Sequence, residues 1–376
     1  MNWPLQENAI DEVDINLLAE FVKTTKRFTQ GEKVREFEET YSKWLGTKYS
    51  VFVNSGSSAN LLLIASLKEL YRWGPETEII VPAVTWSTNV APIIQLNLRP
   101  VFVDVNLYDL SFNHYKMMFA ITPNTKAIFV THLLGIPAGI PKDVMMIEDC
   151  CEAHGATIDR IKVGNFGIGS TFSFYWGHHI TSIEGGMVCT DDEELHKLLL
   201  LKRSHGLARE LPEQYHAEIK ERYPDANFSF LFLTDGFNLR NSEFNAVVGL
   251  QQLRKIDEFI DKRNENYKYF LEICKPYGGH LLLLDSEGIS SFCFPFIFRR
   301  KGMLKDFLKV LEENEIESRS PIVGGNLTKH PFLVQYSGDF PNADFVHTNS
   351  CYIGNNQFVD YDRLDRLKEI LRKFFK

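Results

Sequence analysis

Two adjacent histidines, His178 and His179, lie in the segment of this chain with the most potential chemistry, residues 173–186. Successive side chains of an extended segment point to opposite sides, so one imidazole is expected to enter a site and the other to support it. A neutral imidazole is a general base suited to neutral pH. Zinc binding is disfavoured because no other His or Cys stands at a familiar structural spacing. Taken alone, the segment is interpreted by default as a pair of structural histidines.

Three carboxylates, Glu148, Asp149 and Glu152, follow an apolar run that is typical of a buried strand. Ligands of open α/β sheets bind at the carboxyl ends of the strands, which is where these groups are expected. An Asp at that place is able to hold a cationic ring nitrogen, as in an enzyme that uses pyridoxal phosphate. A metal site or a helix N-cap explains these residues equally well at this point.

A third motif, Asn54-Ser55-Gly56-Ser57-Ser58-Ala59-Asn60, lies where a strand is expected to end and a helix to begin. Free backbone N–H groups at a helix N-terminus, with a Gly that permits close approach, form a phosphate site. An ordinary capped helix is the equal alternative. Gly164, Gly167 and Gly169 do not form a dinucleotide loop, because their spacing is G-x-x-G-x-G instead of G-x-G-x-x-G.

Elements that position these motifs alternate between short apolar runs and helical patterns, which predicts a mainly parallel sheet with helices on both faces. The expected strands are residues 51–53, 78–81, 100–103, 127–130, 144–147 and 170–174. The expected helices of this part are residues 57–71, 87–96 and 193–203.

A second, smaller α+β unit is expected after this sheet. Apolar spacing predicts one long helix over residues 245–277 that leaves the first domain. A strand at 292–298 and helices at 304–314 and 361–375 complete the unit. We therefore expect a large cofactor-binding domain with an N-terminal segment, residues 1–249, and a small C-terminal domain, residues 250–376.

Composition favours a soluble cytoplasmic enzyme. The 376 residues include 41 Lys and Arg against 49 Asp and Glu, so no basic nucleic-acid-binding face is implied. No signal peptide is visible, and the longest uncharged stretch, 79–98, contains two prolines and is a poor membrane span. The six cysteines form no disulfide framework and are expected to be reduced.

Taken together, the motifs resemble a known family. The three motifs above, Pro82-Ala83-Val84-Thr85-Trp86, and Gly236-Phe237-Asn238-Leu239-Arg240 with Gly249-Leu250 occur in the order of the DegT/DnrJ/EryC1/StrS sugar aminotransferases. That family is similar to aspartate aminotransferase in fold (fold type I) and binds pyridoxal or pyridoxamine 5'-phosphate. The resemblance therefore implies an α/β protein with a mainly parallel seven-stranded sheet and a smaller C-terminal α+β domain.

Carried onto this chain, the family pattern assigns most of the cofactor site. Gly56 and Ser57 would hold the cofactor phosphate from a helix N-terminus, and Ser173 would add a hydroxyl. Trp86 would stack on the pyridine ring. Asp149 would pair with the ring nitrogen and keep it protonated.

Further positions concern the ring hydroxyl, the subunit partner and the amino donor. Glu152 stands where many relatives have Gln, near the ring hydroxyl. Asn238 would reach the phosphate of the neighbouring subunit, which implies a homodimer with shared active sites. Arg240 would meet a carboxylate such as that of L-glutamate.

His178 departs from the family pattern, because the aminotransferases carry at this position the Lys that forms the Schiff base. Without that amine the cofactor would be held noncovalently, and an imidazole base would remain. This exchange looks like the subgroup of sugar 3-dehydratases. It implies pyridoxamine phosphate-dependent loss of the C3 hydroxyl of a nucleotide-linked 4-keto-6-deoxyhexose, with glutamate restoring the cofactor, in 3,6-dideoxyhexose (colitose) biosynthesis for surface polysaccharide.

The substrate expected from this resemblance is GDP-4-keto-6-deoxy-D-mannose. CDP-linked relatives carry an iron–sulfur cluster, whereas the cysteines here are scattered without a C-x-C or C-x-x-C pair. His205, Arg209 and Arg319 would border the substrate, and a guanidinium is well matched to pyrophosphate oxygens. A sugar aminotransferase, or an inactive relative that binds cofactor, is the alternative.

Overall fold

A seven-stranded sheet with the order β1-β9-β8-β5-β4-β2-β3 forms the centre of the protein. The computed structural model describes residues 2–141 and 144–376. Strands β8, β5, β4, β2 and β3 run parallel, and β9 lies antiparallel between β8 and β1. The strands are β1 Tyr49–Val53, β2 Glu78–Pro82, β3 Arg99–Val103, β4 Thr125–Thr131, β5 Met146–Asp149, β8 Gly169–Ser173 and β9 Gly186–Thr190. The predicted mainly parallel seven-stranded α/β sheet is confirmed.

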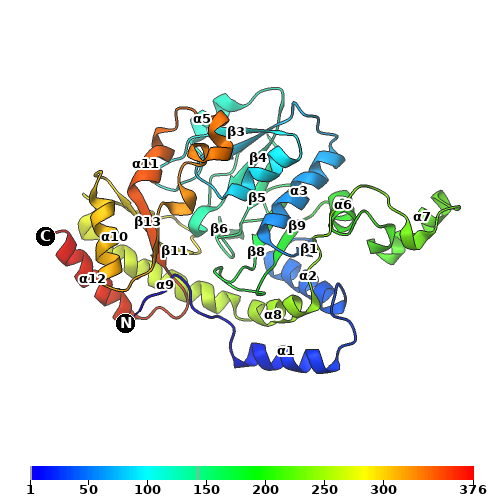
Figure 1. Ribbon diagram of the computed structural model, residues 1–376, viewed down its shortest axis with the longest axis horizontal. Helices are drawn as coiled ribbons and strands as arrows, with labels where there is room; N and C mark the ends of the chain where they lie inside the picture. Colours follow the sequence, from blue (N-terminus) through cyan, green and yellow to red (C-terminus); the bar gives the residue numbers. More distant parts are fainter. Residues whose placement is uncertain (1, 142–143) are drawn as a thin grey trace.

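Alternation of side chains along each strand separates two cores on opposite faces of this sheet. In β1, Val51 and Val53 join one buried cluster while Phe52 joins another. The first cluster lies under α3 (Gly56–Leu70) and α6 (Glu193–Arg203), and the second lies under α2 (Glu32–Leu45) and α8 (Glu243–Leu253). Helices therefore cover both faces, as Figure 1 shows.

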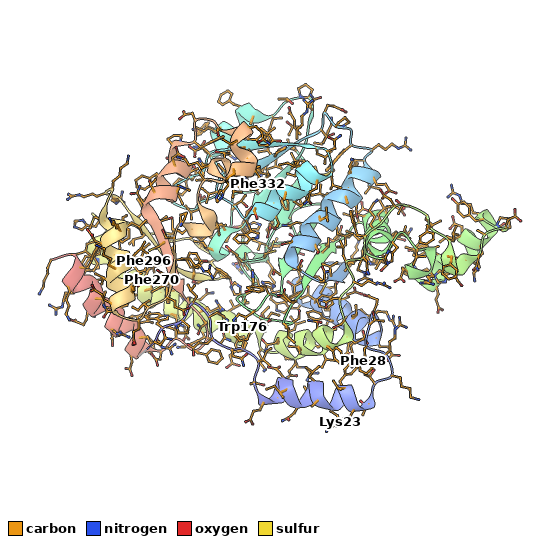
Figure 2. All side chains as sticks on the ribbon, in the orientation of Figure 1. Lys23, Phe28, Trp176, Phe270, Phe296 and Phe332 are labelled. Carbon is orange, nitrogen blue, oxygen red and sulfur yellow. The ribbon has the colours of Figure 1, made fainter. Side chains whose placement is uncertain are left out.

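The C-terminal part is built on a four-stranded antiparallel sheet with the order β10-β11-β13-β12. Its strands are β10 Leu281–Leu282, β11 Cys293–Phe298, β12 Ser318–Arg319 and β13 Ser350–Gly354, and its helices are α9 Ile256–Cys274, α10 Met303–Glu313, α11 Pro341–Asn349 and α12 Tyr361–Phe374. Aromatic rings fill its core. Phe270 and Phe296, labelled in Figure 2, meet edge to face with ring centroids 5.3 Å apart.

The remaining elements surround these two sheets. They are α1 Glu12–Thr24, α4 Ala91–Gln95, α5 His114–Ala120, α7 His216–Arg222 and a two-stranded ribbon of β6 Thr157–Ile158 and β7 Ile161–Lys162. Helix α7 projects from one end of the molecule (Figure 1). Within the described residues, every helix is too short or too polar to cross a membrane.

Two sequence expectations about the helices were wrong. The helix predicted over residues 87–96 is a 3₁₀ turn, Ser87–Asn89, followed by the short helix α4. The single helix predicted over residues 245–277 is two helices, α8 and α9, which are interrupted at Arg254 and Lys255. No Gly or Pro marks this break, so apolar periodicity did not reveal it. Lys255 there lies within ion-pair distance of Asp11 and Asp14 at the start of α1.

The division between residues 249 and 250 falls inside α8. A shared core also joins the two parts: Ala83 and Val84 from the first pack in one buried cluster with Cys293 and Ile297 from the second. The two-domain division therefore stays a prediction about the chain's organisation.

Glu148 in β5 is a buried carboxylate that anchors the loop before β8. It accepts hydrogen bonds from the backbone N–H groups of Gly164, Phe166 and Gly167 at 2.7–2.8 Å. His132 Nδ1 accepts the N–H of Ala138, so its Nε2 carries a proton and donates it to Glu148 over 3.1 Å. These bonds account for both carboxylate oxygens, which makes Glu148 a structural residue.

We predict that Glu148→Gln lowers the free energy of unfolding by about 3 kcal/mol at pH 7, since an amide NH₂ would then face buried N–H donors. Burial opposes ionisation, but His132, Gly164 and Gly167 together hold the pKa of Glu148 below its usual value. Its stabilisation is therefore present above about pH 4.3 and is lost as the pH falls below that value. Urea unfolding at pH 7 and pH 4 measures both effects.

The matched control is Glu194→Gln on the exposed face of α6, which should change stability by about 0.5 kcal/mol or less. Equal destabilisation by the two substitutions would contradict the anchoring role of Glu148.

Candidate active site

His178 lies in the loop that joins β8 to β9, and its imidazole is held by one hydrogen bond. Nδ1 is 2.5 Å from the carbonyl oxygen of Cys151. A carbonyl oxygen carries no hydrogen, so Nδ1 must donate and the proton of the neutral ring resides there. The other nitrogen, Nε2, is therefore left with a free lone pair, which is the form that a general base requires.

The environment of His178 keeps this ring neutral. Burial lowers the pKa of His178 to about 4, although the hydrogen bond to Cys151 and the charge of Asp149 oppose that shift. The positive charge of Arg263 lowers it further. At neutral pH the imidazole is consequently an unprotonated base.

His179 faces a different part of the protein. It is fully buried, and its Nε2 is 3.2 Å from the carbonyl oxygen and 3.1 Å from the hydroxyl of Ser290. Its ring also packs near those of His154 and Phe292. The two adjacent histidines thus have separate partners, and His179 braces the loop against the segment before β11.

Asp149 ends β5 and presents its carboxylate on the face opposite to Glu148. Its Oδ2 accepts hydrogen bonds from the side-chain amides of Asn60 at 3.0 Å and Asn89 at 2.8 Å. Its Oδ1 accepts the N–H of Cys151 at 2.9 Å. The carboxylate is 4% exposed and fixed from three sides, so it is oriented to meet a cationic donor.

Cys151 connects these two groups through its backbone. Its N–H donates to the Asp149 carboxylate and its carbonyl oxygen accepts from the His178 imidazole, so one residue holds both side chains. Its Sγ would lie 3.0 Å from a Cβ placed on Gly56. The helix N-terminus is therefore part of the same cluster.

Gly56 is required at the start of α3 by close packing. A Cβ there would lie 2.7 Å from Cβ of Ser173, at the end of β8. Ser55 caps the helix by accepting the N–H of Ser58 at 3.1 Å. The N–H groups of Gly56 and Ser57 in the first turn lack intrahelical acceptors, which suits them, with the Ser173 hydroxyl, to an anion.

Trp86 and Glu152 lie beside this cluster. The carbonyl oxygen of Trp86 accepts the N–H of Asn89, the residue that binds Asp149, and 55% of the Trp86 side chain is exposed. Glu152 Oε2 accepts the N–H of Leu134 at 2.9 Å. Burial, with a smaller effect from the charge of Asp149, raises the pKa of Glu152 to about 7.

Asn238 and Arg240 lie beside the end of β1. The carbonyl oxygen of Leu239 accepts the N–H of Asn54, and Arg240 forms an isolated bridge with Val53. Arg240 Nε donates to Asn238 Oδ1 at 3.0 Å. Within one chain, these two side chains therefore contact each other next to the motif at 54–60.

Three residues predicted to bind the substrate lie outside the cluster of Asp149, Cys151 and His178. His205 is exposed with φ of 63°, Arg209 donates to the carbonyl oxygen of Ser229 at 2.8 Å, and Arg319 is exposed in β12. Within the described part of the chain, no hydrogen bond or ion pair joins these side chains to Asp149 or His178. Their role in the site stays a prediction.

Three contributors were missed from the sequence. Asn60 belongs to the motif at 54–60, and Asn89 follows Trp86 by one helical turn, so both spacings offered a signal. Arg263 donates to the carbonyl oxygen of His178 from α9 at 3.3 Å. Arg263 lies 85 residues from His178, but the sequence held one signal, since this Arg falls in the apolar register of α9 between Ile260 and Tyr267.

Comparison with known proteins places this arrangement in a family. The family model described as DegT/DnrJ/EryC1/StrS aminotransferase matches residues 8–372. The chain therefore belongs to this family. The GDP-4-keto-6-deoxy-D-mannose 3-dehydratase of Escherichia coli O55:H7 is 36% identical, with 99% of this chain and 100% of that protein covered.

Solved structures show the same likeness. A GDP-4-keto-6-deoxymannose-3-dehydratase variant with bound GDP-perosamine has a TM-score of 0.90 at 36% identity, with 98% of this chain and 100% of that chain covered. The same enzyme with a trapped PLP-glutamate geminal diamine has a TM-score of 0.90 at 35% identity, with the same coverage. The protein thus has the fold of pyridoxal phosphate-dependent aminotransferases, which is the predicted fold type I.

We predict that Glu152→Gln removes a pH dependence of stability. Because the pKa of Glu152 is higher in the folded protein than in the unfolded chain, ionisation favours unfolding, and stability is lost as the pH rises from about 4.5 to about 7. Relative to wild type, the variant should gain about 3 kcal/mol at pH 8 and little at pH 4.5. Urea unfolding at both pH values measures the difference.

Glu272→Gln on the exposed side of α9 is the control and should show no such pH-dependent gain. A constant difference between Glu152→Gln and wild type across this range would refute the assignment.

Proposed function

We propose that this chain is a pyridoxal/pyridoxamine phosphate-dependent 3-dehydratase that removes the C3 hydroxyl of GDP-4-keto-6-deoxy-D-mannose. One observation carries the proposal: His178, which the motif resemblance places at the position of the aminotransferases' Schiff-base Lys, has a free Nε2 and shares Cys151 as a hydrogen-bond partner with Asp149. The 36% identity to an Escherichia coli enzyme of this name over nearly the whole of both chains supports the same activity.

The residues present fit the cofactor. The start of α3 at Gly56 and Ser57, with the Ser173 hydroxyl, would hold the phosphate. Asp149 would pair with the ring nitrogen, and the exposed indole of Trp86 would cover the ring. The bound cofactor supplies an electron sink.

Glu152 and His178 complete the fit. With a pKa of about 7, Glu152 is able to donate a hydrogen bond to the ring hydroxyl or to accept one from it. Because residue 178 has no amine, this position supplies no covalent link, and the cofactor would be held noncovalently.

His178 would move one proton. Nε2 accepts it at the reacting centre while Nδ1–H stays bound to the carbonyl oxygen of Cys151, so the ring does not rotate during transfer. The imidazolium that forms is stabilised by the nearby charge of Asp149. Nε2 then returns the proton to the departing C3 hydroxyl, which leaves as water.

The remaining predicted residues would contact substrate and amino donor. Arg240 would bind the carboxylate of L-glutamate, which restores pyridoxamine phosphate, and Arg209 or Arg319 would bind the pyrophosphate of the nucleotide sugar. His205 would border the sugar. A solved relative contains GDP-perosamine and another contains PLP and glutamate, which supports both ligand classes. The enzyme would act in the cytoplasm. Its product would serve the biosynthesis of a 3,6-dideoxyhexose (colitose) for surface polysaccharide.

We also propose that the chain acts as a homodimer in which Asn238 reaches the partner's cofactor phosphate. Exposed apolar side chains on α1, Val13, Ile15, Leu17 and Val22, offer a surface for this association. Sedimentation velocity should show a species of twice the 43.3 kDa chain mass. A monomer at micromolar concentration would refute the proposal.

Product analysis tests the activity. Incubation with pyridoxamine phosphate, L-glutamate and GDP-4-keto-6-deoxy-D-mannose should yield a 3-deoxy-4-keto sugar and ammonia, detected by mass spectrometry and an ammonia assay. Retention of nitrogen on the sugar would instead establish an aminotransferase, and no turnover would favour an inactive relative. The CDP-linked analogue in parallel tests the choice of nucleotide.

We predict that His178→Lys abolishes dehydration, with kcat at least about 100-fold lower, because the general base is lost and an amine replaces it. The variant should retain cofactor through gel filtration after borohydride reduction, whereas wild type should lose it. His178→Asn is the matched control that removes the base without adding an amine. Dehydration by His178→Lys at the wild-type rate would show that His178 is not the base.

A further inference from the structure

Arg263 is a cation buried without an ion-pair partner among the described residues. Its side chain is fully inaccessible in α9, and no described carboxylate lies within ion-pair distance of it. An isolated buried charge is costly, so such a group is expected to be held by strong hydrogen bonds. Burial lowers the pKa of Arg263 to about 10, which leaves it protonated at neutral pH.

The hydrogen bonds of Arg263 go to three backbone carbonyl oxygens. Nη1 donates to Asn355 at 2.5 Å and to Phe292 at 3.1 Å, and Nη2 donates to His178 at 3.3 Å. Phe292 precedes β11 and Asn355 follows β13, which are paired neighbours in the C-terminal sheet. The guanidinium therefore ties the loop of His178 to one end of that sheet.

Two further contacts strengthen this connection. The ring of Phe292 packs on the imidazole of His178 with centroids 5.4 Å apart. The side-chain amide of Asn355 donates back to the carbonyl oxygen of Arg263 and to the hydroxyl of Ser291, both at 2.9 Å. The residue that anchors the His178 backbone is thus itself fixed from the C-terminal sheet.

We infer that Arg263 is a positioning residue for His178: its fork to three carbonyl oxygens holds the His178 backbone, so that Nε2 keeps a fixed direction toward the reacting centre. The inference rests on the proposed function only in taking His178 as the base. The hydrogen bond from His178 to Cys151 fixes the ring, whereas Arg263 fixes the chain that carries the ring.

Arg263 also acts on the charge of His178. Among the groups that face this imidazole, Asp149 from β5 favours its protonation, and Arg263 from α9 opposes it. His154 and His179 are neutral neighbours because burial lowers the pKa of each well below 6.5, and the ring of Tyr175 lies 6.1 Å away. Removing Arg263 should therefore raise the pKa of His178.

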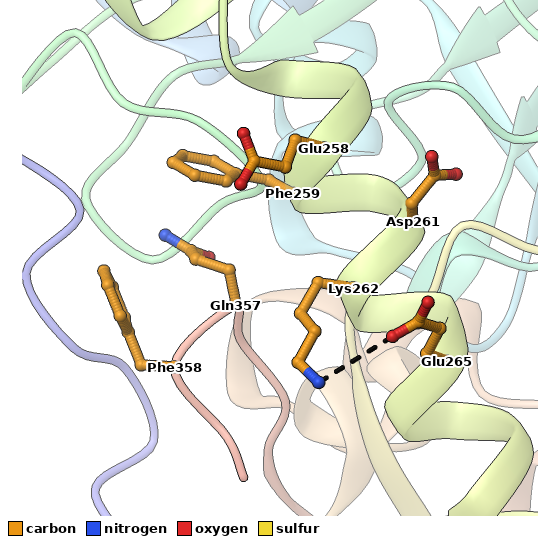
Figure 3. A pocket seen from close by; sticks show the side chains of 7 residues that line it. All are labelled: Glu258, Phe259, Asp261, Lys262, Glu265, Gln357 and Phe358. Atoms are coloured by element: carbon orange, nitrogen blue, oxygen red, sulfur yellow. Dashed lines mark ion pairs between the residues drawn. The ribbon is translucent and has the colours of Figure 1, made fainter.

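Two substitutions separate the effect of the positive charge from the effect of the hydrogen bonds. Arg263→Met removes both the charge and the guanidinium hydrogen bonds, whereas Arg263→Lys keeps the charge and loses the paired guanidinium donors. Lys262→Met is the matched control. Lys262 is the next residue of α9, but it points to the outer side of the helix and pairs with Glu265 at 3.8 Å (Figure 3). The substitution Lys262→Met therefore removes one cation from the same helix and leaves the contacts of the His178 loop unchanged.

NMR titration of the imidazole carbons in cofactor-free protein, with His178→Asn to assign the signal, measures the charge effect. In Arg263→Met, His178 should take up its proton about one pH unit higher than in wild type, whereas Arg263→Lys and Lys262→Met should match wild type. This titration reports the charge of Arg263, whereas its hydrogen bonds to the His178 loop are tested by the kinetics below.

Steady-state kinetics measure the positioning effect. Arg263→Met should lower kcat by about tenfold or more, with KM for the nucleotide sugar changed by about threefold or less, because base geometry and not binding is disturbed. Arg263→Lys should recover part of kcat. Lys262→Met should leave both constants unchanged.

Wild-type kcat in folded Arg263→Met would overturn the positioning role, and a wild-type His178 titration in that variant would overturn the effect of its charge. If that variant does not fold, Arg263→Lys decides, and an unchanged kcat in Arg263→Lys would overturn the positioning role equally. A wild-type protein without dehydratase activity would refute the proposed function, while the NMR titration would still test the link between Arg263 and His178.

Discussion

The hydrogen bond from Nδ1 of His178 to the carbonyl oxygen of Cys151 is the interaction on which the site depends. It assigns the tautomer of the ring and leaves Nε2 unprotonated. The same residue gives its N–H to Asp149, so one peptide segment sets the relative position of base and acid. That segment follows β5, whose two parallel neighbours, β4 and β8, hold it rigidly.

Adjacent carboxylates of β5 show how one strand serves stability and chemistry at once. Glu148 faces three backbone N–H groups and His132, while Asp149 faces Asn60 and Asn89. The alternation of side chains along a strand sends the two groups to opposite faces. A buried anion is tolerated on each face because hydrogen-bond donors fixed by the fold surround it.

Burial also accounts for the unusual protonation of the site. The same loss of water that lowers the pKa of His178 to about 4 raises that of Glu152 to about 7. An unprotonated base thus binds the carbonyl oxygen of Cys151, and a carboxyl group that titrates near neutrality is the next residue in the chain. Perturbed groups of this kind concentrate where proton transfer is needed, which agrees with the proposed dehydration.

Local sequence determined the parallel sheet, the turn at Gly56, the carboxylates at the end of β5 and the presence of His178 in place of a Lys, because each depends on residue type and spacing within a short segment. The break between α8 and α9 was missed because no Gly or Pro marks it. The partners of Asp149 and His178 were decided only by tertiary structure. Asn60, Asn89 and Arg263 lie 89, 60 and 85 residues from the groups they bind, and only the packing of distant strands and helices brings them together.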